Sequence, residues 1–352
     1  MKKLISYPET QQFRQTIRAV SDRVQFVDKE KGYDRTIKLP IIKFRGTVKL
    51  HGTNSGVCFN TKTGDMWAQS RENIITIEKD NAGFAFFVES KKEVFKHMFS
   101  TIKTDADIIS IYGEWCGQSI QKGVALSQLP NKMFVVFGVK LSNVVENETE
   151  GKWLKEFDAS YFNDLKEHNI YNILSFKTYE IDIDFENPHI AQKKMIEYVE
   201  EVETQCPVGK AFGVEGVGEG IVWETYLGDN RIIFKTKGEK HSSSRVTTLS
   251  AVDVEKMEGI KEFVEYAVTE NRLMQGISIV FANEPPVVEK TGDFLRWVVN
   301  DVMKEEMDTL IKNNLEPKSV NGHISKEARR WFHEYLDKEA GVVDTDNGQE
   351  EC

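Results

Sequence analysis

The chain has few of the features that mark several large classes of protein. It lacks the run of about 18 apolar residues that a membrane-spanning helix requires. Its four cysteines, at positions 58, 116, 206 and 352, are far apart and form no Cys-x-x-Cys pair, so neither a zinc site nor a disulfide framework is expected. Residues 1–6 are basic but precede no apolar core, so no secretory signal is expected either. These absences favour a protein of the reducing cytoplasm.

Positive charge is also scarce. The 352 residues include 46 Lys and Arg against 56 Asp and Glu, a formal net charge of −10 that argues mildly against nucleic acid as a partner. Binding depends on where the cations lie, however, and residues 235–245 form a local basic stripe. Much of the acid lies elsewhere, including the end of the chain, where residues 341–352 predict a solvated, disordered tail.

The pattern of apolar residues predicts an α+β domain followed by a small all-helical domain. Strands are expected at 41–48, 56–59, 66–70, 107–114 and 132–141 and in a hairpin over 219–237, with helices at 8–22, 82–99, 152–168 and 189–204 and a polar loop at 143–151. Because the strands do not alternate regularly with helices, the sheets are expected to be antiparallel. Helical periodicity follows residue 245, which predicts domains over 1–245 and 246–340.

The most informative run is Lys49-Leu-His51-Gly-Thr-Asn54, which follows an alternating strand. A lysine at the end of a strand, before a tight glycine turn, can be presented to a ligand as a nucleophile. An amine attacks phosphorus only when it is neutral, and nearby cations and partial burial favour that form. The rest of the chain should therefore supply positive charge, carboxylates for a metal ion and an aromatic ring for base stacking.

Five ordered segments together resemble the motifs of the RNA ligase 2 family, the nick-sealing branch of the covalent nucleotidyltransferases. They are residues 49–54, 112–114, 134–137, 219–223 and 235–237, and the run 117–124 after the third motif is also similar. Residues 264–272 more weakly resemble the family's helical C-terminal domain. The resemblance implies an antiparallel-sheet nucleotidyltransferase domain of the ATP-grasp-like ligase type. It also implies ATP as co-substrate, Mg²⁺ or Mn²⁺ as cofactor, RNA as partner and a role in RNA repair.

The family pattern implies a role for each matching residue. Lys49 would take AMP from ATP as a lysyl phosphoramidate, with His51 and Asn54 facing the phosphates. Arg71 would contact sugar or phosphate, for which a guanidinium fork suits bidentate binding. Without the series of motifs around it, an isolated lysine, histidine or arginine of this kind is most simply a surface or structural residue.

Two glutamates and one aromatic residue complete the nucleotide site that the resemblance implies. Glu114 would hold the ribose and Glu219 would bind the metal ion, although Glu215 precedes an identical Glu-Gly dipeptide and is the alternative to Glu219. Phe137 would stack on adenine, although without the resemblance a phenylalanine in this apolar strand is most simply part of the core. Phe134, three residues earlier in the same strand, should face the other way.

Lys235 and Lys237 alternate along one strand and would share a face, holding the α-phosphate and promoting the neutral form of Lys49. Two departures from the family pattern stand out. Val48 replaces a residue that can be charged in the family, and the interval between Glu219 and Lys235 is short. Neither change removes a catalytic group.

Two alternatives to an RNA ligase remain open at this point. A DNA ligase or capping enzyme shares the chemistry, but these more usually carry aspartate where this chain has His51, and no oligonucleotide-binding barrel is recognisable after Lys237. A non-catalytic RNA-binding protein of the same fold is the other. The resemblance to phage enzymes associates the chain with repair in a host cytoplasm.

Overall fold

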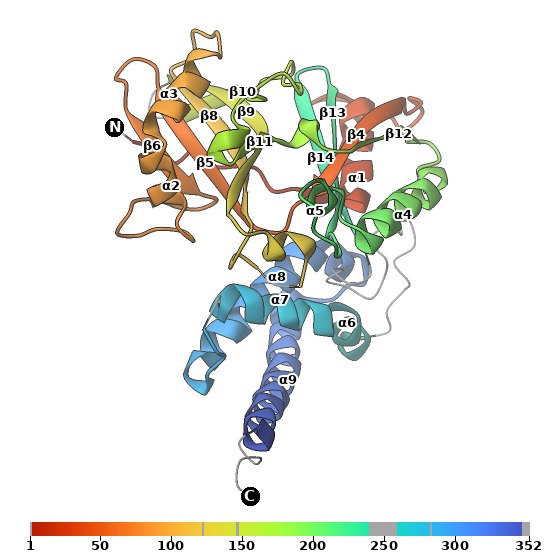
Figure 1. Cartoon of the computed structure of the whole chain (residues 1–352). Coiled ribbons are helices and arrows are strands. Elements are labelled where there is room, and N and C mark those ends of the chain that lie inside the picture. The colour runs from red at the N-terminus through yellow and green to blue at the C-terminus, as the bar shows by residue number, and fades with distance from the viewer. Residues whose placement is uncertain (1, 122, 146–147, 239–258, 282–283, 347–352) are drawn as a thin grey trace, which may run out of the picture. The chain divides into compact units, whose positions relative to one another are not determined.

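The chain divides into two compact units, Met1–Thr236 and Lys237–Cys352. The computed structural model describes residues 2–121, 123–145, 148–238, 259–281 and 284–346 (Figure 1). The expected domain boundary at 245 and the greater part of the basic stripe, residues 239–245, lie outside these ranges. None of the helices in the described ranges has the length and apolar character that crossing a bilayer requires.

The first unit is built on two sheets in which neighbouring strands run mostly antiparallel, which confirms the α+β prediction (Figure 1). One sheet has the order β1-β14-β13-β4-β12, and β1 is its parallel member. Its strands are β1 (Gln11–Gln12), β4 (Ile41–Lys49), β12 (Thr178–Asp184), β13 (Gly220–Leu227) and β14 (Asn230–Lys237).

The second sheet has the order β10-β9-β8-β5-β6-β7, with β11 added in parallel beside β9. Its strands are β5 (Thr53–Asn60), β6 (Met66–Ser70), β7 (Ile74–Ile75), β8 (Ile108–Cys116), β9 (Met133–Val145), β10 (Glu148–Trp153) and β11 (Ile170–Asn172). A separate small hairpin joins β2 (Phe26–Asp28) to β3 (Gly32–Tyr33).

Helices cover the outer faces of both sheets. Aromatic contacts pack α1 (Phe13–Gln25) and α4 (His189–Thr204) against the first sheet: the Phe13 ring lies 5.1 Å from Phe234, and Tyr198 lies 6.1 Å from Trp223. Helices α2 (Phe84–Ser90) and α3 (Lys92–Ser100) share a core with β5, β8 and β9, and a short α5 (Pro207–Ala211) precedes β13. The inner faces meet in a third cluster, which combines Ile233 and Val222 of the first sheet with Tyr112 and Phe137 of the second.

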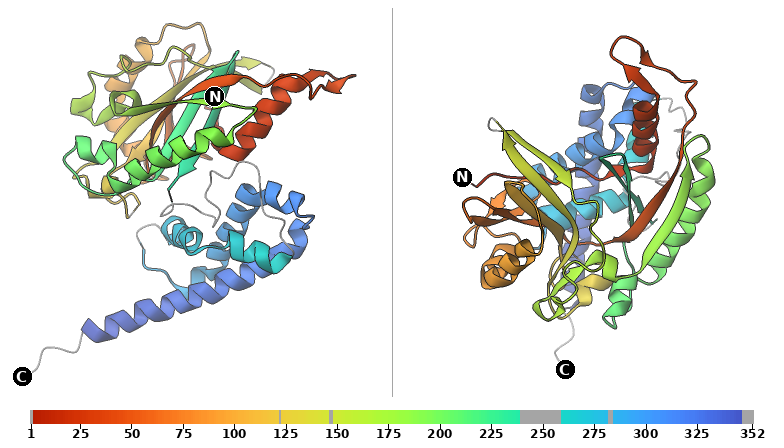
Figure 2. Two further views of the ribbon diagram at one scale, coloured as in Figure 1. Left: turned by 90° about the vertical axis from the view of Figure 1, so that its right-hand side faces the viewer. Right: turned by 90° about the horizontal axis from the view of Figure 1, so that it is seen from above.

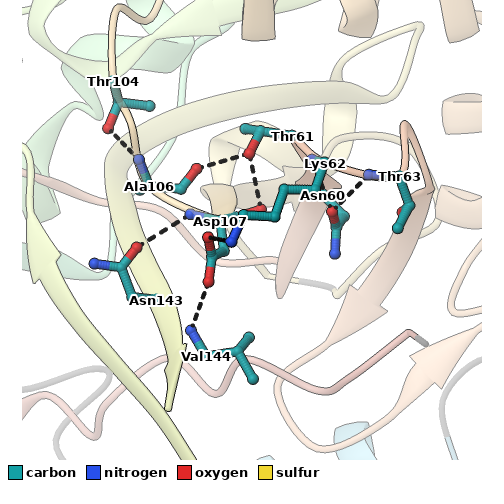
Figure 3. A network of polar contacts seen from close by, with 9 residues as sticks. All are labelled: Asn60, Thr61, Lys62, Thr63, Thr104, Ala106, Asp107, Asn143 and Val144. Atoms are coloured by element: carbon teal, nitrogen blue, oxygen red, sulfur yellow. Dashed lines mark hydrogen bonds and ion pairs between the residues drawn. The ribbon is translucent and has the colours of Figure 1, made fainter.

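A polar network fixes the second sheet at the end far from Asn54 and Glu114 (Figure 3). Asp107 pairs with Lys62 at 2.6 Å and accepts a hydrogen bond from the Val144 amide, and its own amide donates to the Asn143 side chain. The Lys62 hydrogen bond, then the Val144 hydrogen bond, lower the pKa of the Asp107 carboxyl. Asp107, just before β8, is thus bonded both to Lys62, just after β5, and to Asn143 and Val144 within β9. These contacts hold the three strands in register.

The predictions for residues 143–168 are wrong. The expected polar loop at 143–151 contains the end of β9 and most of β10, and the expected helix at 152–168 is a series of turns with one 3₁₀ segment, Lys166–His168. Phe162 adopts a φ of 59°, outside the helical region. The Asn172 amide group donates to the carbonyls of Asp158 and Tyr161, so side chains replace the helical hydrogen-bond ladder there.

The second unit is helical over its described residues, as predicted for this part of the chain. Its helices are α6 (Ile260–Ala267), α7 (Glu270–Phe281), α8 (Thr291–Lys312) and α9 (Pro317–Asp346). Its core contains a buried ionic group: the Arg272 guanidinium, 0% exposed, donates to Asp301 at 2.7 Å and lies 3.6 Å from Glu306, which is also 0% exposed. Helix α9 extends into the expected tail as far as Asp346, and 347–352 lie outside the described ranges.

Candidate active site

The ends of two adjacent strands bring the candidate nucleophile to an acid. Lys49 is the last residue of β4 and pairs with Gly220, the first residue of β13. Glu219 directly precedes Gly220, so its side chain leaves the backbone beside Lys49 although 170 residues separate the two in sequence. The alternation of buried and partly exposed residues along β4 places Lys49 on the inner face of its sheet, away from Phe44 and the α1 side.

Glu219 connects the lysine to the histidine of the same motif. The Lys49 ammonium donates to Glu219 Oε2 at 2.6 Å, and His51 Nδ1 lies 3.1 Å from the same oxygen. Glu219 is 2% exposed, whereas Lys49 and His51 remain 22% and 18% exposed. The carboxylate is therefore fixed in the protein, while the amine and the imidazole stay accessible to a ligand.

A second glutamate holds the turn after the nucleophile. Glu114 Oε1 accepts a hydrogen bond of 3.0 Å from the Gly52 amide. Gly52 is required by space: an added Cβ would lie 2.4 Å from the Trp115 carbonyl oxygen. Asn54 stands directly opposite Glu114 in the β5–β8 ladder, so the two side chains share a face. The structure thus places Asn54 and Glu114 beside the turn that carries His51.

Burial makes Glu114 an unusual acid. Desolvation raises its pKa from 4.5 to about 7. The positive charge of Lys49 acts against this rise, whereas the negative charge of Glu219 adds to it. Arg71 and the hydrogen bond from Gly52 also lower the pKa, by smaller amounts. These interactions place Glu114, Lys49, Glu219 and Arg71 in one electrostatic cluster. Arg71 follows β6, and its Nε is buried without a hydrogen-bond partner, a donor that a bound anion could satisfy.

The two phenylalanines of β9 face opposite ways, as their spacing predicts. Phe134 is 0% exposed in the core beneath α2 and α3, whereas Phe137 is half-buried and packs in the cluster between the sheets. Tyr112 pairs with Gly138 and Gly113 with Val136, so Phe137 is the extra residue of a β-bulge. The bulge keeps Phe137 on the face that carries Glu114.

Lys235 and Lys237 share the inner face of the first sheet. Ile233, two residues before Lys235, belongs to the cluster between the sheets, so Lys235 and Lys237 alternate onto the same face. Thr236 points the other way and accepts a hydrogen bond of 2.9 Å from the Trp223 indole. Both lysines therefore extend from the face that also carries Lys49.

Of the two candidate glutamates for a metal ion, only Glu219 contacts Lys49; the Glu215 side chain is exposed. Within the described ranges, no group of three or more His, Cys, Asp or Glu side chains gathers as a metal cage. Mg²⁺ commonly takes one or two protein carboxylates and completes its octahedron with water and substrate phosphates. A single buried carboxylate at Glu219 fits that mode of binding.

Sequence reasoning missed an aromatic and cationic group beside Phe137. The Tyr7 ring lies 5.1 Å from the Phe137 ring, edge on, and 5.3 Å from Tyr112. Arg231 is 4% exposed, donates to Glu224 through two nitrogens and places its guanidinium 4.1 Å from the centroid of the Trp153 ring. Arg231 could have been found by extending the alternation of Lys237 and Lys235 backwards along β14; Tyr7 carries no such signal.

Comparisons with known proteins indicate the family to which the chain belongs. The family model described as RNA ligase matches residues 42–237, which is more than half of the chain and includes every site residue that the sequence predicted. A comparison with curated proteins gave no match.

Solved structures of a Naegleria gruberi RNA ligase are similar to this chain. The form with pyrophosphate has 16% identity and a TM-score of 0.42, and the match covers 68% of this chain and 57% of that one. A variant with AMP and manganese has 16% identity and a TM-score of 0.41, with the same coverage. A variant with ATP and manganese has 15% identity and a TM-score of 0.42, and the match covers 68% of this chain and 56% of that one. The chain thus spans less than two thirds of these proteins. From the family match over residues 42–237, the chain belongs to the RNA ligase family.

Proposed function

We propose that this protein is an ATP-dependent RNA ligase that joins 3′-hydroxyl and 5′-phosphate ends, with nicks in duplex RNA as its substrate. The observation that carries the proposal is the convergence of Lys49, Glu219 and His51 around one carboxylate oxygen, at 2.6 and 3.1 Å. This group lies in a family-matched domain, beside a second acid and on the sheet face that carries Lys235 and Lys237.

The proposed reaction has three steps, in which one AMP group is transferred twice and then released. The neutral Lys49 amine attacks the α-phosphorus of ATP, forming a phosphorus–nitrogen bond as the bond to pyrophosphate breaks. An RNA 5′-phosphate oxygen then attacks the same phosphorus, which releases the lysine and forms an RNA-adenylate. Finally the 3′-hydroxyl of the adjacent strand attacks the 5′-phosphate and AMP leaves. Positioning and charge neutralisation provide most of the catalysis in such phosphoryl transfers.

The contacts support a role for each side chain in this reaction. Lys235 and Lys237 would neutralise the α-phosphate, and Arg71 would bind sugar or phosphate through its buried Nε. Glu114 and Asn54 would orient the ribose and phosphates from the β5–β8 ladder. Phe137 would stack on adenine.

Glu219 would hold a divalent cation, which neutralises charge at the α-phosphate when bound. In the ligand-free protein the Glu219 carboxylate pairs with the Lys49 ammonium. Transfer of the carboxylate from the lysine to a cation would favour the neutral amine that attack requires.

The first test is covalent labelling with ATP that carries a radioactive α-phosphate. Lys49→Ala should abolish the labelled band, whereas Lys43→Ala should leave it unchanged. Lys43 is a matched control because it lies on the same strand, and its side chain is 63% exposed and pairs only weakly with the exposed Glu180. Retention of label by Lys49→Ala would refute the assignment of the nucleophile.

The second test fixes the polymer. Nicked duplexes in every combination of RNA and DNA strands should be sealed best when the two ends to be joined are RNA. Efficient sealing of an all-DNA nick would instead favour the DNA ligase alternative. We further propose that the residues after 245 help to engage the duplex. Truncation there should leave self-adenylation but impair sealing, and unimpaired sealing would remove them from the mechanism.

A further inference from the structure

The hairpin of β2 and β3 projects from the end of α1, as Figure 2 shows. It exposes large apolar side chains. Phe26 is 46% exposed and Tyr33 is 52% exposed, and the two pair across the hairpin with ring centroids 5.5 Å apart. The Arg35 guanidinium lies 4.8 Å from the Tyr33 ring. Two aromatic rings on a projecting two-stranded hairpin bury little surface of their own, so they are available to a ligand.

The hairpin is held by its own polar contacts, which keeps its shape independent of the exposed rings. Asp28 Oδ1 accepts hydrogen bonds from the Glu30 and Lys31 amides, at 2.9 and 2.7 Å, and so forms the turn. Gly32 completes the turn with a φ of +68°, which glycine adopts without strain. The following segment is fastened to α1 by a hydrogen bond of 2.9 Å from the Gln25 amide group to the Ile37 carbonyl.

This part of an acidic protein is basic. Residues 13–43 contain eight Lys and Arg against four Asp and Glu, a net of +4 in a chain whose total is −10. Lys29, Lys31 and Lys38 are exposed, and within the described ranges none of them forms an ion pair. Asp22, one of the four acidic residues in this range, pairs with Arg35 at 2.8 Å. The hairpin and its following segment, residues 26–38, have four Lys and Arg against three Asp and Glu, so their availability to phosphates depends on these three exposed lysines and not on a large excess of positive charge.

Helix α1 connects this hairpin to a strand of the site. Gln12, at the start of α1, pairs with Lys235 of β14, so α1 leads away from the site strand. Its 13 residues span roughly 20 Å at about 1.5 Å per residue. The hairpin thus lies at the far end of a helix of roughly 20 Å that starts beside Lys235.

We propose that the β2–β3 hairpin is a second RNA contact, which grips the duplex arm beside the nick. Lys29, Lys31 and Lys38 contact backbone phosphates, and Phe26 and Tyr33 pack on ribose rings along the minor groove. Recognition is by charge and shape, without sequence preference, as expected for A-form duplexes. This proposal rests on the proposed function, because it needs RNA as the ligand.

The test measures binding of a fluorescent nicked RNA duplex to the full chain by anisotropy, across a series of salt concentrations. The triple variant Lys29→Ala/Lys31→Ala/Lys38→Ala should bind on the order of 10-fold or more weakly at about 0.1 M salt. The slope of log K against log salt should become shallower by about 0.9 for each phosphate that the variant no longer neutralises. The control Lys103→Ala/Lys166→Ala/Lys193→Ala removes the same charge from exposed positions elsewhere and should bind as the unaltered protein does.

The aromatic half of the proposal has its own variant. Phe26→Ser/Tyr33→Ser should weaken binding without changing the salt slope, and Phe86→Ser, at a ring that is 61% exposed on α2, is its control. Labelling with ATP should be normal in all these variants, which shows that unit 1 is folded. If the triple lysine variant and its control bind RNA alike while the protein labels and seals, the hairpin proposal is overturned and the proposed function stands. A protein that neither labels nor binds RNA would overturn the proposed function first.

Discussion

The raised pKa of Glu114 makes a quantitative prediction about stability. Its pKa of about 7 in the folded protein exceeds the ordinary value of 4.5, so the folded state binds a proton more tightly than the unfolded state. The associated stability is fully present below pH 4.5 and is lost as the pH rises through 7. A shift of this size corresponds to about 3 kcal/mol, of which about 2.5 kcal/mol lies between about pH 5 and pH 8.

Replacing Glu114 by Gln removes this titration while keeping the size of the side chain. The free energy of unfolding of Glu114→Gln, minus that of the unaltered protein, should therefore rise by about 2.5 kcal/mol from about pH 5 to pH 8. The physical reason is that the ionised carboxylate loses hydration in its buried position, whereas the amide carries no charge.

Urea unfolding at several pH values, followed by tryptophan fluorescence, measures this difference. Glu30→Gln, at an exposed residue of the hairpin turn, is the matched control, and its difference should stay constant with pH. A constant difference for Glu114→Gln as well would refute the reasoning, because burial would then not control the acid. A difference of the opposite sign would mean that Lys49 and Arg71 outweigh desolvation.

Three further predictions concern single residues. Phe137→Ala should raise the KM for ATP in self-adenylation by about 5- to 150-fold, since stacking on a base is worth about 1 to 3 kcal/mol; an unchanged KM would place adenine elsewhere. Gly52→Ala should abolish adenylation, measured as labelled protein, because its Cβ would lie 2.4 Å from the Trp115 carbonyl oxygen and the turn must move; normal labelling would contradict that constraint. Arg272→Met should destabilise the second unit by about 3 to 5 kcal/mol in thermal unfolding, because it leaves buried acids without their cation; an unchanged transition would show that the ionic group is dispensable.

Local patterns were sufficient to predict the strands that build the site. Residues 41–49 alternate between buried and more exposed positions, and this period of two is visible in the sequence. The same alternation predicts that Phe134 and Phe137 lie on opposite faces of their strand. The β-bulge does not change this, because the register shifts only at Phe137 itself, which is the extra residue. The contact between Lys49 and Glu219 has no local signal, since 170 residues separate them; only the order of motifs in the resemblance linked them.

The errors have equally specific causes. Phe157 and Phe162, together with Leu165, are buried at spacings close to those of one helical face, which mimicked a helix over 152–168. Their segment is instead shaped by the Asn172 side-chain amide, which donates to the carbonyls of Asp158 and Tyr161, and the spacing of apolar residues cannot reveal these bonds. Likewise Tyr7 and Arg231 are 224 residues apart, so their hydrogen bond of 3.3 Å and its place beside Phe137 depend on how the two sheets face each other.

The hydrogen bond between Glu114 and the Gly52 amide couples the nucleophile turn to the acidity of the medium. A charged carboxylate accepts a stronger hydrogen bond than a neutral carboxyl group. With a pKa of about 7, Glu114 changes between the two forms across the range in which cells operate. The segment between Lys49 and Gly52 is thus tethered more firmly in mildly alkaline solution. The protection of the Gly52 amide from hydrogen exchange, relative to the intrinsic rate at each pH, should increase more than its neighbours' as the pH rises.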